Sequence, residues 1–231
     1  MFYLNSSYLM YMLPALLLMM LTQWYVNSSY KKYSQVAARS GLTGAQAAQR
    51  LISSSGLYQV RIETVRGNLT DHYDPRSKTL RLSAGVAQSP SVAALAISAH
   101  ELGHAMQDAE NYFPLRLRAA LVPAVNIGSY LGWILIFIGL MLRMTDLAWL
   151  GVLVFAGGAV FALATLPVEL NASARAKQLL ANTGMISGEE ERQGVNRVLN
   201  AAALTYVAGL VTAIMQLLYF VSLVGGSSRR R

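Results

Sequence analysis

Four long stretches of this chain contain no Asp, Glu, Lys or Arg, and the polar residues gather between them. The uncharged stretches are residues 1–30, 119–142, 147–168 and 198–228. Each meets the roughly 20-residue length with which a helix crosses the hydrocarbon core of a bilayer. We therefore predict about four transmembrane helices, within residues 8–26, 119–142, 147–168 and 204–224. Only residues 143–146 separate the second helix from the third, so these two must form a tight helical hairpin.

The charged residues concentrate in two polar blocks, residues 31–118 and 169–197. Together the blocks contain 15 of the 19 Lys and Arg residues, and Arg143 and Arg229–Arg231 supply the other four. Because basic segments next to transmembrane helices are retained in the cytoplasm, we expect both blocks on the cytoplasmic side. The three terminal arginines favour the opposite orientation if the fourth helix crosses the membrane completely.

Composition agrees with a membrane protein. The 231 residues are 54% hydrophobic and 13% charged, whereas a soluble domain carries about 25% charged residues. This argues against a disordered chain, a fibre and a free cytosolic enzyme. The absence of cysteine excludes disulfides, thiolate metal ligands and a cysteine nucleophile. The net charge of +8 suits anionic lipid, and without a basic stripe interleaved with aromatic residues we expect no nucleic-acid partner.

The first polar block contains the start signals of two helices. Thr43 and Gln46 have the spacing of a capping box before a short amphipathic helix. Ser89 and Pro90 supply an N-cap and a first helical residue for a second helix, which we expect to run to about Glu110.

Between these helices the hydrophobic period changes to two, which indicates strands. We predict one strand that begins at residue 58, alternates over residues 58–63 and is broken by residues 66–68. Residues 69–73 and 78–83 are predicted to form a hairpin that turns at residues 74–77. Residues 80–83 are expected at the edge of the sheet, where an extended peptide could pair with them or a neighbouring loop could cover them.

The second helix contains His100-Glu101-Leu102-Gly103-His104, the HExxH pattern. The i, i+4 spacing puts both imidazoles on one helical face, where both can reach a single tetrahedral zinc ion. Glu101 lies beside them and can take a proton from a water molecule that the metal acidifies. The alternative is a helix with two incidental histidines and a surface glutamate. Because two of the chain's only three histidines lie in the motif, we favour a zinc site over this alternative and expect one Zn²⁺ per chain.

A catalytic zinc site needs a third protein ligand and an open fourth position. The helix itself offers none, because no His and Gly follow His104 at the metzincin spacing. The remaining candidates are His72, Asp71, Asp74, Asp108 and Glu169. Glu169 stands out because it follows an uncharged stretch, and a carboxylate at a membrane boundary must be paired, ligated or hydrated. Its alternative role is a helix-start glutamate that the helix dipole favours after Pro167.

Four further side chains could serve the site. Ser173 lies one turn after Glu169 and could orient a ligand, or it could simply pack against a neighbouring helix. His72 could approach from the hairpin, or it could be an ordinary turn histidine. Tyr206 and Arg175 could stabilise the oxyanion of a tetrahedral intermediate. Their alternative roles are a buried tyrosine of the fourth span and a basic anchor at the membrane interface.

From about residue 40 to residue 224 the chain resembles the YugP-like neutral zinc metallopeptidases of bacterial membranes. The resemblance is carried by SGLTGAQAA, GLYQV, LTDHYDPRSKTLRLS, AALAISAHELGHAMQ, PLRLRAALVPAVNIGS, TLPVELNASARA and AAALTYVA. It implies a membrane-embedded zinc peptidase of gluzincin type, with His100, His104 and Glu169 as ligands and Glu101 as the base. The arrangement is also similar to HtpX-type and CAAX-prenyl proteases, whose HExxH precedes a distant E-x-x-x-D. Ser173 stands in the position of that aspartate, so the resemblance gives no carboxylate–histidine pair here.

These observations predict an α+β membrane protein in which about four transmembrane helices accompany a small cytoplasmic zincin-like domain with a short β-hairpin or sheet and the HExxH helix. We divide it into an N-terminal anchor (1–30), a catalytic domain (31–118), a transmembrane hairpin (119–168), a cytoplasmic segment with the third ligand (169–200), and a C-terminal helix with a basic tail (201–231).

The expected function is zinc-dependent endoproteolysis of membrane or membrane-proximal polypeptides at the cytoplasmic face of a bacterial cytoplasmic membrane. One alternative is a non-catalytic adaptor that keeps zinc for structure, against which the intact Glu101 argues because a structural site needs no base. The other is intramembrane proteolysis of the site-two type, against which the nearby Asp108 and Glu110 argue. The sequence leaves the substrate and the oligomeric state open.

Overall fold

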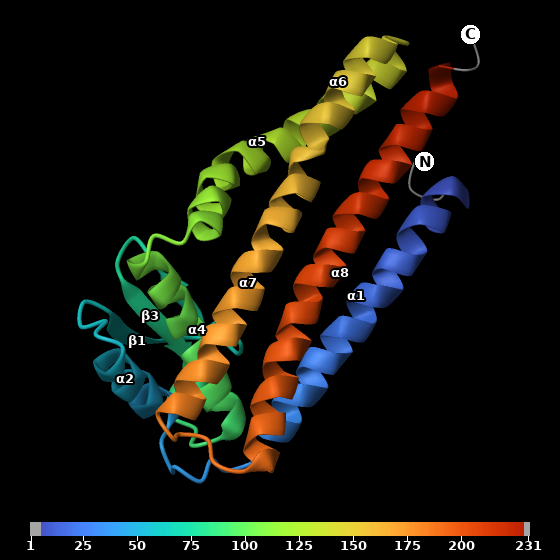
Figure 1. Cartoon of the computed structure of the whole chain (residues 1–231). Helices are drawn as coiled ribbons and strands as arrows, with labels where there is room; N and C mark the ends of the chain where they lie inside the picture. The colour runs from blue at the N-terminus through green and yellow to red at the C-terminus, as the bar shows by residue number, and fades with distance from the viewer. Residues whose placement is uncertain (1–5, 229–231) are drawn as a thin grey trace. The chain divides into compact units, whose positions relative to one another are not determined.

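The computed structural model describes residues 6–228, within which eight helices and three strands occur. In chain order they are α1 (Ser6–Tyr33), α2 (Gly44–Ser54), β1 (Arg61–Val65), β2 (His72–Asp74), β3 (Thr79–Ser83), α3 (Ala84–Ala87), α4 (Val92–Ala109), α5 (Phe113–Met141), α6 (Thr145–Phe155), α7 (Gly157–Asn182) and α8 (Glu189–Ser228) (Figure 1).

The chain divides into two compact units. We call the first the helical unit; it comprises the described parts of Met1–Thr22, Arg116–Leu166 and Thr205–Arg231. We call the second the α/β unit; it comprises Gln23–Leu115 and Pro167–Leu204. The HExxH motif and the Glu169 segment therefore belong to the same unit.

Among the described residues, four helical segments are long and apolar enough to cross a membrane. They are α1, α5, the consecutive helices α6 and α7 (Thr145–Asn182), and α8. The four apolar helices predicted from the uncharged stretches are confirmed. The third is interrupted, since α6 ends at Phe155 and α7 begins at Gly157, where two adjacent glycines weaken the helix.

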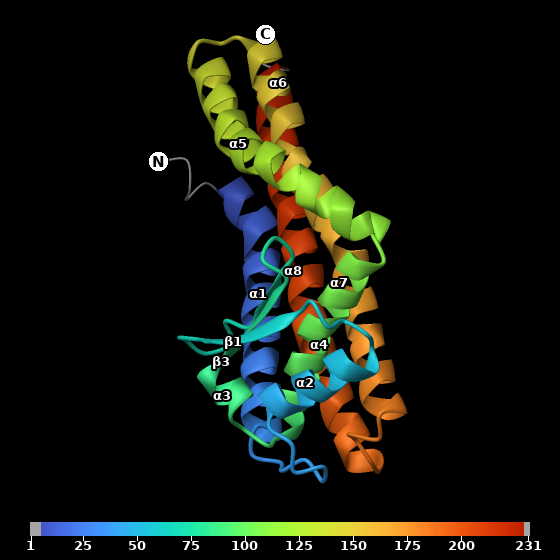
Figure 2. The ribbon, with the colours of Figure 1, turned by 90° about the vertical axis from the view of Figure 1, so that its left-hand side faces the viewer.

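Within the helical unit, α5 and α6 form the expected tight hairpin (Figures 1 and 2). The N–H of Met144 donates to the carbonyl of Gly139 at 2.7 Å and closes the turn. A Cβ atom at Gly139 would lie 2.4 Å from the backbone nitrogen of Ala148, so the two helices can approach this closely only with glycine at that position.

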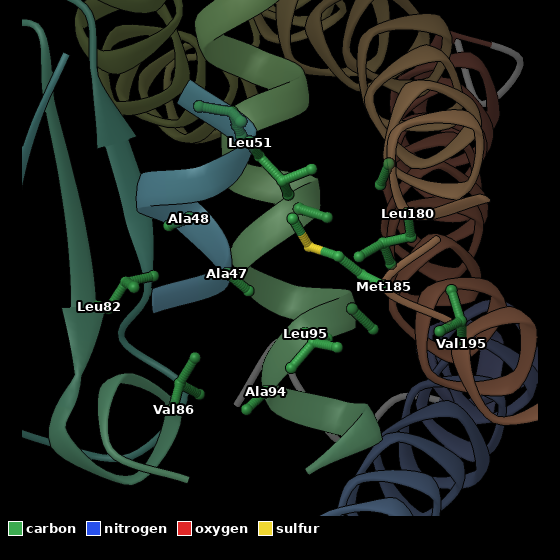
Figure 3. Packing of buried hydrophobic residues seen from close by; sticks show 14 of the residues in the cluster. Ala47, Ala48, Leu51, Leu82, Val86, Ala94, Leu95, Leu180, Met185 and Val195 are labelled. Atoms are coloured by element: carbon green, nitrogen blue, oxygen red, sulfur yellow. The ribbon is translucent and has the colours of Figure 1, made fainter. Parts of the chain in front are cut away.

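In the α/β unit, α4 lies between α2 and the sheet on one side and α7 with the start of α8 on the other (Figure 3). Its Ala94, Leu95 and Leu102 are fully buried among side chains from all of these elements. The helix with the HExxH motif is therefore the centre of a packed core, which holds its polar face in a fixed orientation.

The three strands form one sheet with the order β1-β3-β2. Figure 2 labels β1 and β3. The predicted hairpin is confirmed, because β2 pairs with β3 antiparallel, and Asp74 accepts hydrogen bonds from Arg76 and Ser77 in the turn. The prediction that residues 80–83 form a sheet edge is wrong. β1 pairs parallel with the other side of β3, so β3 is central and β2 is an edge strand.

Two predicted boundaries shift for local reasons. β1 begins at Arg61 rather than at residue 58, because the N–H of Val60 bonds to the carbonyl of Leu57 in a turn. Ser91, not Ser89, caps α4 by accepting from Ala94 at 3.2 Å. Residues 90–92 instead continue as extended backbone that hydrogen-bonds with residues 36–38. The capping box of Thr43 and Gln46 at the start of α2 is confirmed.

Candidate metal centre

Two histidines of α4 and one glutamate of α7 converge within the α/β unit. The Nε2 atoms of His100 and His104 lie 3.3 Å and 3.4 Å from Glu169 Oε2. The two imidazole rings are 4.9 Å apart and nearly perpendicular, with an interplanar angle of 84°. The Glu169 side chain is 2% exposed, so its carboxylate is directed into the protein toward the histidines. The three residues predicted to bind zinc therefore lie close together in the structure.

The distances from Glu169 to the two histidines suit a zinc ion. With metal–ligand bonds of 2.0–2.2 Å, the ligand atoms of a tetrahedral site lie about 3.3–3.6 Å apart. The two distances from Glu169 to the histidines fall within that range. Nitrogen and carboxylate donors are also the types that catalytic zinc sites use, and three protein ligands leave one position for a reactant.

The backbones of α4 and α7 approach closely at Gly103, between the two histidines. A Cβ atom built there would lie 2.6 Å from the carbonyl oxygen of Ala172, a contact that real side chains do not make. Glycine at position 103 and the small Ala172 therefore let the two helices cross where Glu169 can reach both imidazoles. The middle of the HExxH pattern thus has a structural role of its own.

Each histidine contacts a second polar side chain through Nδ1. His100 Nδ1 lies 3.2 Å from Ser173 Oγ, and His104 Nδ1 lies 3.0 Å from Gln107 Oε1. Ser173 is the residue that, from the sequence, could orient a ligand or pack against a neighbouring helix. The contact of Gln107 was missed, although its position three residues after His104 on the same helix face could have indicated it.

Glu101 is held by the edge strand. The backbone N–H of Tyr73 on β2 donates to Glu101 Oε2 at 3.1 Å. The phenol of the same tyrosine donates to Asp108 at 2.8 Å, and Lys78 forms an ion pair with Asp108 at 2.6 Å. Burial and the hydrogen bond to Asp108 raise the pKa of Tyr73 well above its ordinary value. β2 therefore contacts α4 at Glu101, which precedes His104 in the sequence, and at Asp108, which follows it.

The site favours positive charge. Burial lowers the pKa of His104, but the hydrogen bond with Glu169 and the negative charges of Glu101 and Glu169 raise it by more, so the net shift is upward. A cation between the imidazoles and the carboxylate would gain from the same interactions.

The other ligand candidates lie outside this group of three. His72 Nδ1 contacts the carbonyl of Thr70 at 2.9 Å. Asp71 accepts from the N–H of Ser83 at 2.7 Å, just before α3, and burial raises the pKa of its carboxyl group. Asp74 belongs to the hairpin turn, and Asp108 binds Tyr73 and Lys78.

Each of the three side-chain nitrogens of Arg175 makes a hydrogen bond. Two nitrogens contact the carboxylate of Glu110 at 2.7 Å and 2.6 Å, and the third donates to Asn171 at 2.8 Å. The hydrogen bonds from Arg175 lower the pKa of Glu110. Tyr206 belongs to α8 in the helical unit, and its role stays a prediction.

Comparisons with known proteins agree with this chemistry. A family model described as "Putative neutral zinc metallopeptidase" matches residues 8–225. The "Putative membrane protease YugP" of Bacillus subtilis (strain 168) is 47% identical over 199 residues, which cover 86% of this chain and 88% of that protein. No solved structure matches the chain.

Proposed function

This chain belongs to the neutral zinc metallopeptidase family and is a membrane protein, and from that premise we propose that it is a zinc-dependent endopeptidase. His100, His104 and Glu169 would hold one zinc ion. The observation that carries the proposal is the convergence of two Nε2 atoms on one buried carboxylate oxygen, with Glu101 on the same helix.

A zinc ion in this position would polarise the scissile carbonyl group and lower the pKa of water. Glu101 would act as general base and then as general acid, taking a proton from the attacking water and passing it to the leaving amine. Tyr73 supports this role, since its N–H binds Oε2 and fixes the orientation of the carboxylate. The second carboxylate oxygen is then available to accept the proton.

We further propose that the site works at the cytoplasmic boundary of the bacterial cytoplasmic membrane. Glu169 follows the uncharged residues 147–168 directly in sequence, and 15 of the 19 basic residues lie in the two polar blocks that carry the site. The relative's name, a membrane protease, supports membrane or membrane-proximal polypeptides as substrates.

The two alternative functions, a structural zinc adaptor and an intramembrane protease, require different features of the site. A structural zinc site closes its coordination with four protein ligands and needs no base, whereas here three ligand residues converge and Glu101 is held in place by Tyr73. Intramembrane proteolysis of the site-two type would put the motif in a membrane span. Helix α4 is not among the candidate spans found in the described residues.

The test compares Glu101→Gln with His100→Ala in the full chain, purified in detergent and assayed on an unfolded protein such as casein. Glu101→Gln should keep about one zinc per chain and lose activity by at least the roughly 10²–10⁴-fold typical of a lost general base. His100→Ala should lose zinc and activity together. The exposed Glu190→Gln is the matched control and should behave as the parent.

Near-parental cleavage by Glu101→Gln would overturn the enzymatic proposal in this form. A parent that binds zinc and cleaves nothing would favour the adaptor. If the enzyme is active, comparing membrane proteomes that contain the parent or Glu101→Gln would name its substrates.

A further inference from the structure

Gln107 lies beside the site and makes three side-chain hydrogen bonds, and the mechanism above does not use it. It is fully buried between α4 and α7. Its Oε1 atom lies 3.0 Å from His104 Nδ1. Its Nε2 atom donates to the backbone carbonyl of Val168 at 2.8 Å and to Asn171 Oδ1 at 2.9 Å. The amide therefore joins one predicted zinc ligand to the backbone immediately before another, Glu169.

These contacts determine which way the amide faces. A backbone carbonyl can only accept a hydrogen bond, so the nitrogen of Gln107 must face Val168. Asn171 Oδ1 also accepts from Arg175 Nε at 2.8 Å, which identifies it as the oxygen of its amide. Both hydrogens of Gln107 Nε2 are then used, and Oε1 is left to face His104.

The orientation of Gln107 in turn determines the tautomer of His104. An amide oxygen only accepts, so His104 Nδ1 must carry a proton, and the neutral ring then has its lone pair on Nε2. That lone pair points to the position between His104 and Glu169. In this neutral form the two acceptors, 3.4 Å apart, repel each other, and either a proton on Nε2 or a metal ion between the two atoms removes the repulsion.

His100 has no equivalent constraint. Its Nδ1 atom lies 3.2 Å from Ser173 Oγ, and a hydroxyl group can donate or accept. This contact is compatible with either tautomer of His100. The contact at Nδ1 therefore determines the tautomer of His104 but not that of His100.

We propose that Gln107 is a positioning residue that keeps His104 in the Nδ1–H tautomer, with Nε2 ready to bind zinc. Gln107 is held by the Val168 carbonyl and by Asn171, which Arg175 holds in turn. The inference rests on the proposed function, since it assigns a role to Gln107 at that zinc site. Gln107 replaces here the carboxylate that commonly orients a zinc-bound histidine. A neutral amide fixes the tautomer without adding a further negative charge beside Glu101 and Glu169.

The direct test observes the tautomer in the metal-free full chain. The protein has three histidines, so ¹⁵N-histidine NMR spectra in detergent, recorded at a pH where the rings are neutral, can be assigned with His72→Ala and His100→Ala. The parent should show His104 in the Nδ1–H form alone. Gln107→Met keeps the size of the side chain and should give a mixture of tautomers. Gln107→Glu still accepts from Nδ1 and should restore the single form, even if losing its donors makes the protein less stable.

The second measurement is zinc affinity by competition with a chelator. Removing a group that orients a ligand reduces metal affinity about 10- to 100-fold, which is the loss expected for Gln107→Met. Ser98→Ala is the matched control, because Ser98 is equally buried on α4 and its hydroxyl has no hydrogen-bond partner among residues 6–228. Ser98→Ala should keep the affinity and the tautomer of the parent.

The outcomes separate this inference from the proposed function. Gln107→Met with the parental tautomer and zinc affinity would overturn the role of Gln107, whatever the enzyme does. Equal tautomer mixtures in Gln107→Met and Gln107→Glu would also overturn it, since the effect would then be packing. Near-parental cleavage by Glu101→Gln would instead remove the peptidase proposal, and the tautomer measurement would still decide the role of Gln107.

Discussion

Tyr73 donates its backbone N–H to Glu101 Oε2 at 3.1 Å, so the edge strand β2 is joined directly to the proposed general base. Tyr73 stands opposite Leu80 in the antiparallel ladder, and its N–H points away from β3 toward α4. The bond is therefore additional to the sheet and can be removed without breaking a ladder hydrogen bond.

This contact predicts a difference between two substitutions at position 73. Tyr73→Pro removes the N–H and the phenol, whereas Tyr73→Ala removes the phenol alone. Proline is tolerated on an edge strand where its nitrogen makes no ladder bond, so both variants should fold. Because hydrogen bonds to charged groups contribute about 1.5–3 kcal/mol, we expect kcat to be at least about tenfold lower in Tyr73→Pro than in Tyr73→Ala. Equal kcat values would show that Glu101 is oriented by other contacts.

The close approach of α4 and α7 predicts that Gly103 cannot be enlarged. In Gly103→Ala the new methyl group meets the carbonyl of Ala172 at 2.6 Å, and backbone atoms cannot move aside as a flexible side chain can. We expect the overpacking cost of about 1–3 kcal/mol and weaker zinc binding, because the helices that carry the ligands must separate. Thermal unfolding and chelator competition measure the two effects. In Gly209→Ala the added carbon would have no atom within 4 Å from the described residues outside its own turn of helix, so this variant should show neither loss.

The parts of this structure that follow from local patterns could be predicted from the sequence. The helical repeat puts His100 and His104 on one face, and the Asp74 turn closes the β2–β3 hairpin through contacts within four residues. The sequence indicates Glu169 in a different way, through the cost of leaving a carboxylate without a partner at the end of an apolar stretch. Its 2% exposure shows that the helix α7 buries this charge against the histidines.

The parts that depend on distant pairing could not be predicted. β1 pairs parallel with β3, each residue with a partner 18 positions later in the chain, and nothing in either strand's own alternation identifies that partner. The hydrogen bonds from Tyr73 to Glu101 and from Gln107 to Asn171 join residues 28 and 64 positions apart. These contacts exist only because the packed core brings β2 and α7 against α4.

Asp74 provides a prediction about pH. Hydrogen bonds from Arg81, Ser77 and Arg76 hold its pKa below the ordinary value of an aspartate. A carboxyl group whose pKa is depressed by folding stabilises the protein above its unfolded pKa, about 3.9, and that contribution is lost as pH falls through the folded pKa. The parent should therefore unfold at a higher temperature than Asp74→Asn at pH 7, and the difference should shrink below about pH 4. A difference that is constant with pH would assign the effect to shape rather than charge.

The proposed orientation can be tested with single cysteines, because the chain has none of its own. Ser53 and Ser187 are exposed in the two polar blocks, and Met144 is exposed in the turn between α5 and α6. If both blocks are cytoplasmic, an impermeant maleimide should label Met144→Cys on intact spheroplasts, but should label Ser53→Cys and Ser187→Cys only after lysis. Labelling of either serine position on intact spheroplasts would reverse the proposed topology.

Glu169 gives the sharpest test of the third ligand. In Glu169→Ala the two imidazoles lose the carboxylate that lies 3.3 Å and 3.4 Å from them, so bound zinc should fall well below one per chain and activity should fall with it. Loss of any buried carboxylate could destabilise the fold, and Glu191→Gln controls for this, because Glu191 is also buried and accepts from the N–H groups of Arg39 and Ser187.

The control should be less stable than the parent yet keep its zinc, whereas Glu169→Ala should lose zinc even at temperatures where it remains folded. His72→Ala should keep zinc as well, since its ring contacts the carbonyl of Thr70 and lies outside the group of three. Mass spectrometry under non-denaturing conditions gives the zinc count for each folded variant. Full zinc occupancy and activity in Glu169→Ala, together with zinc loss in His72→Ala, would move the third ligand from α7 to the hairpin.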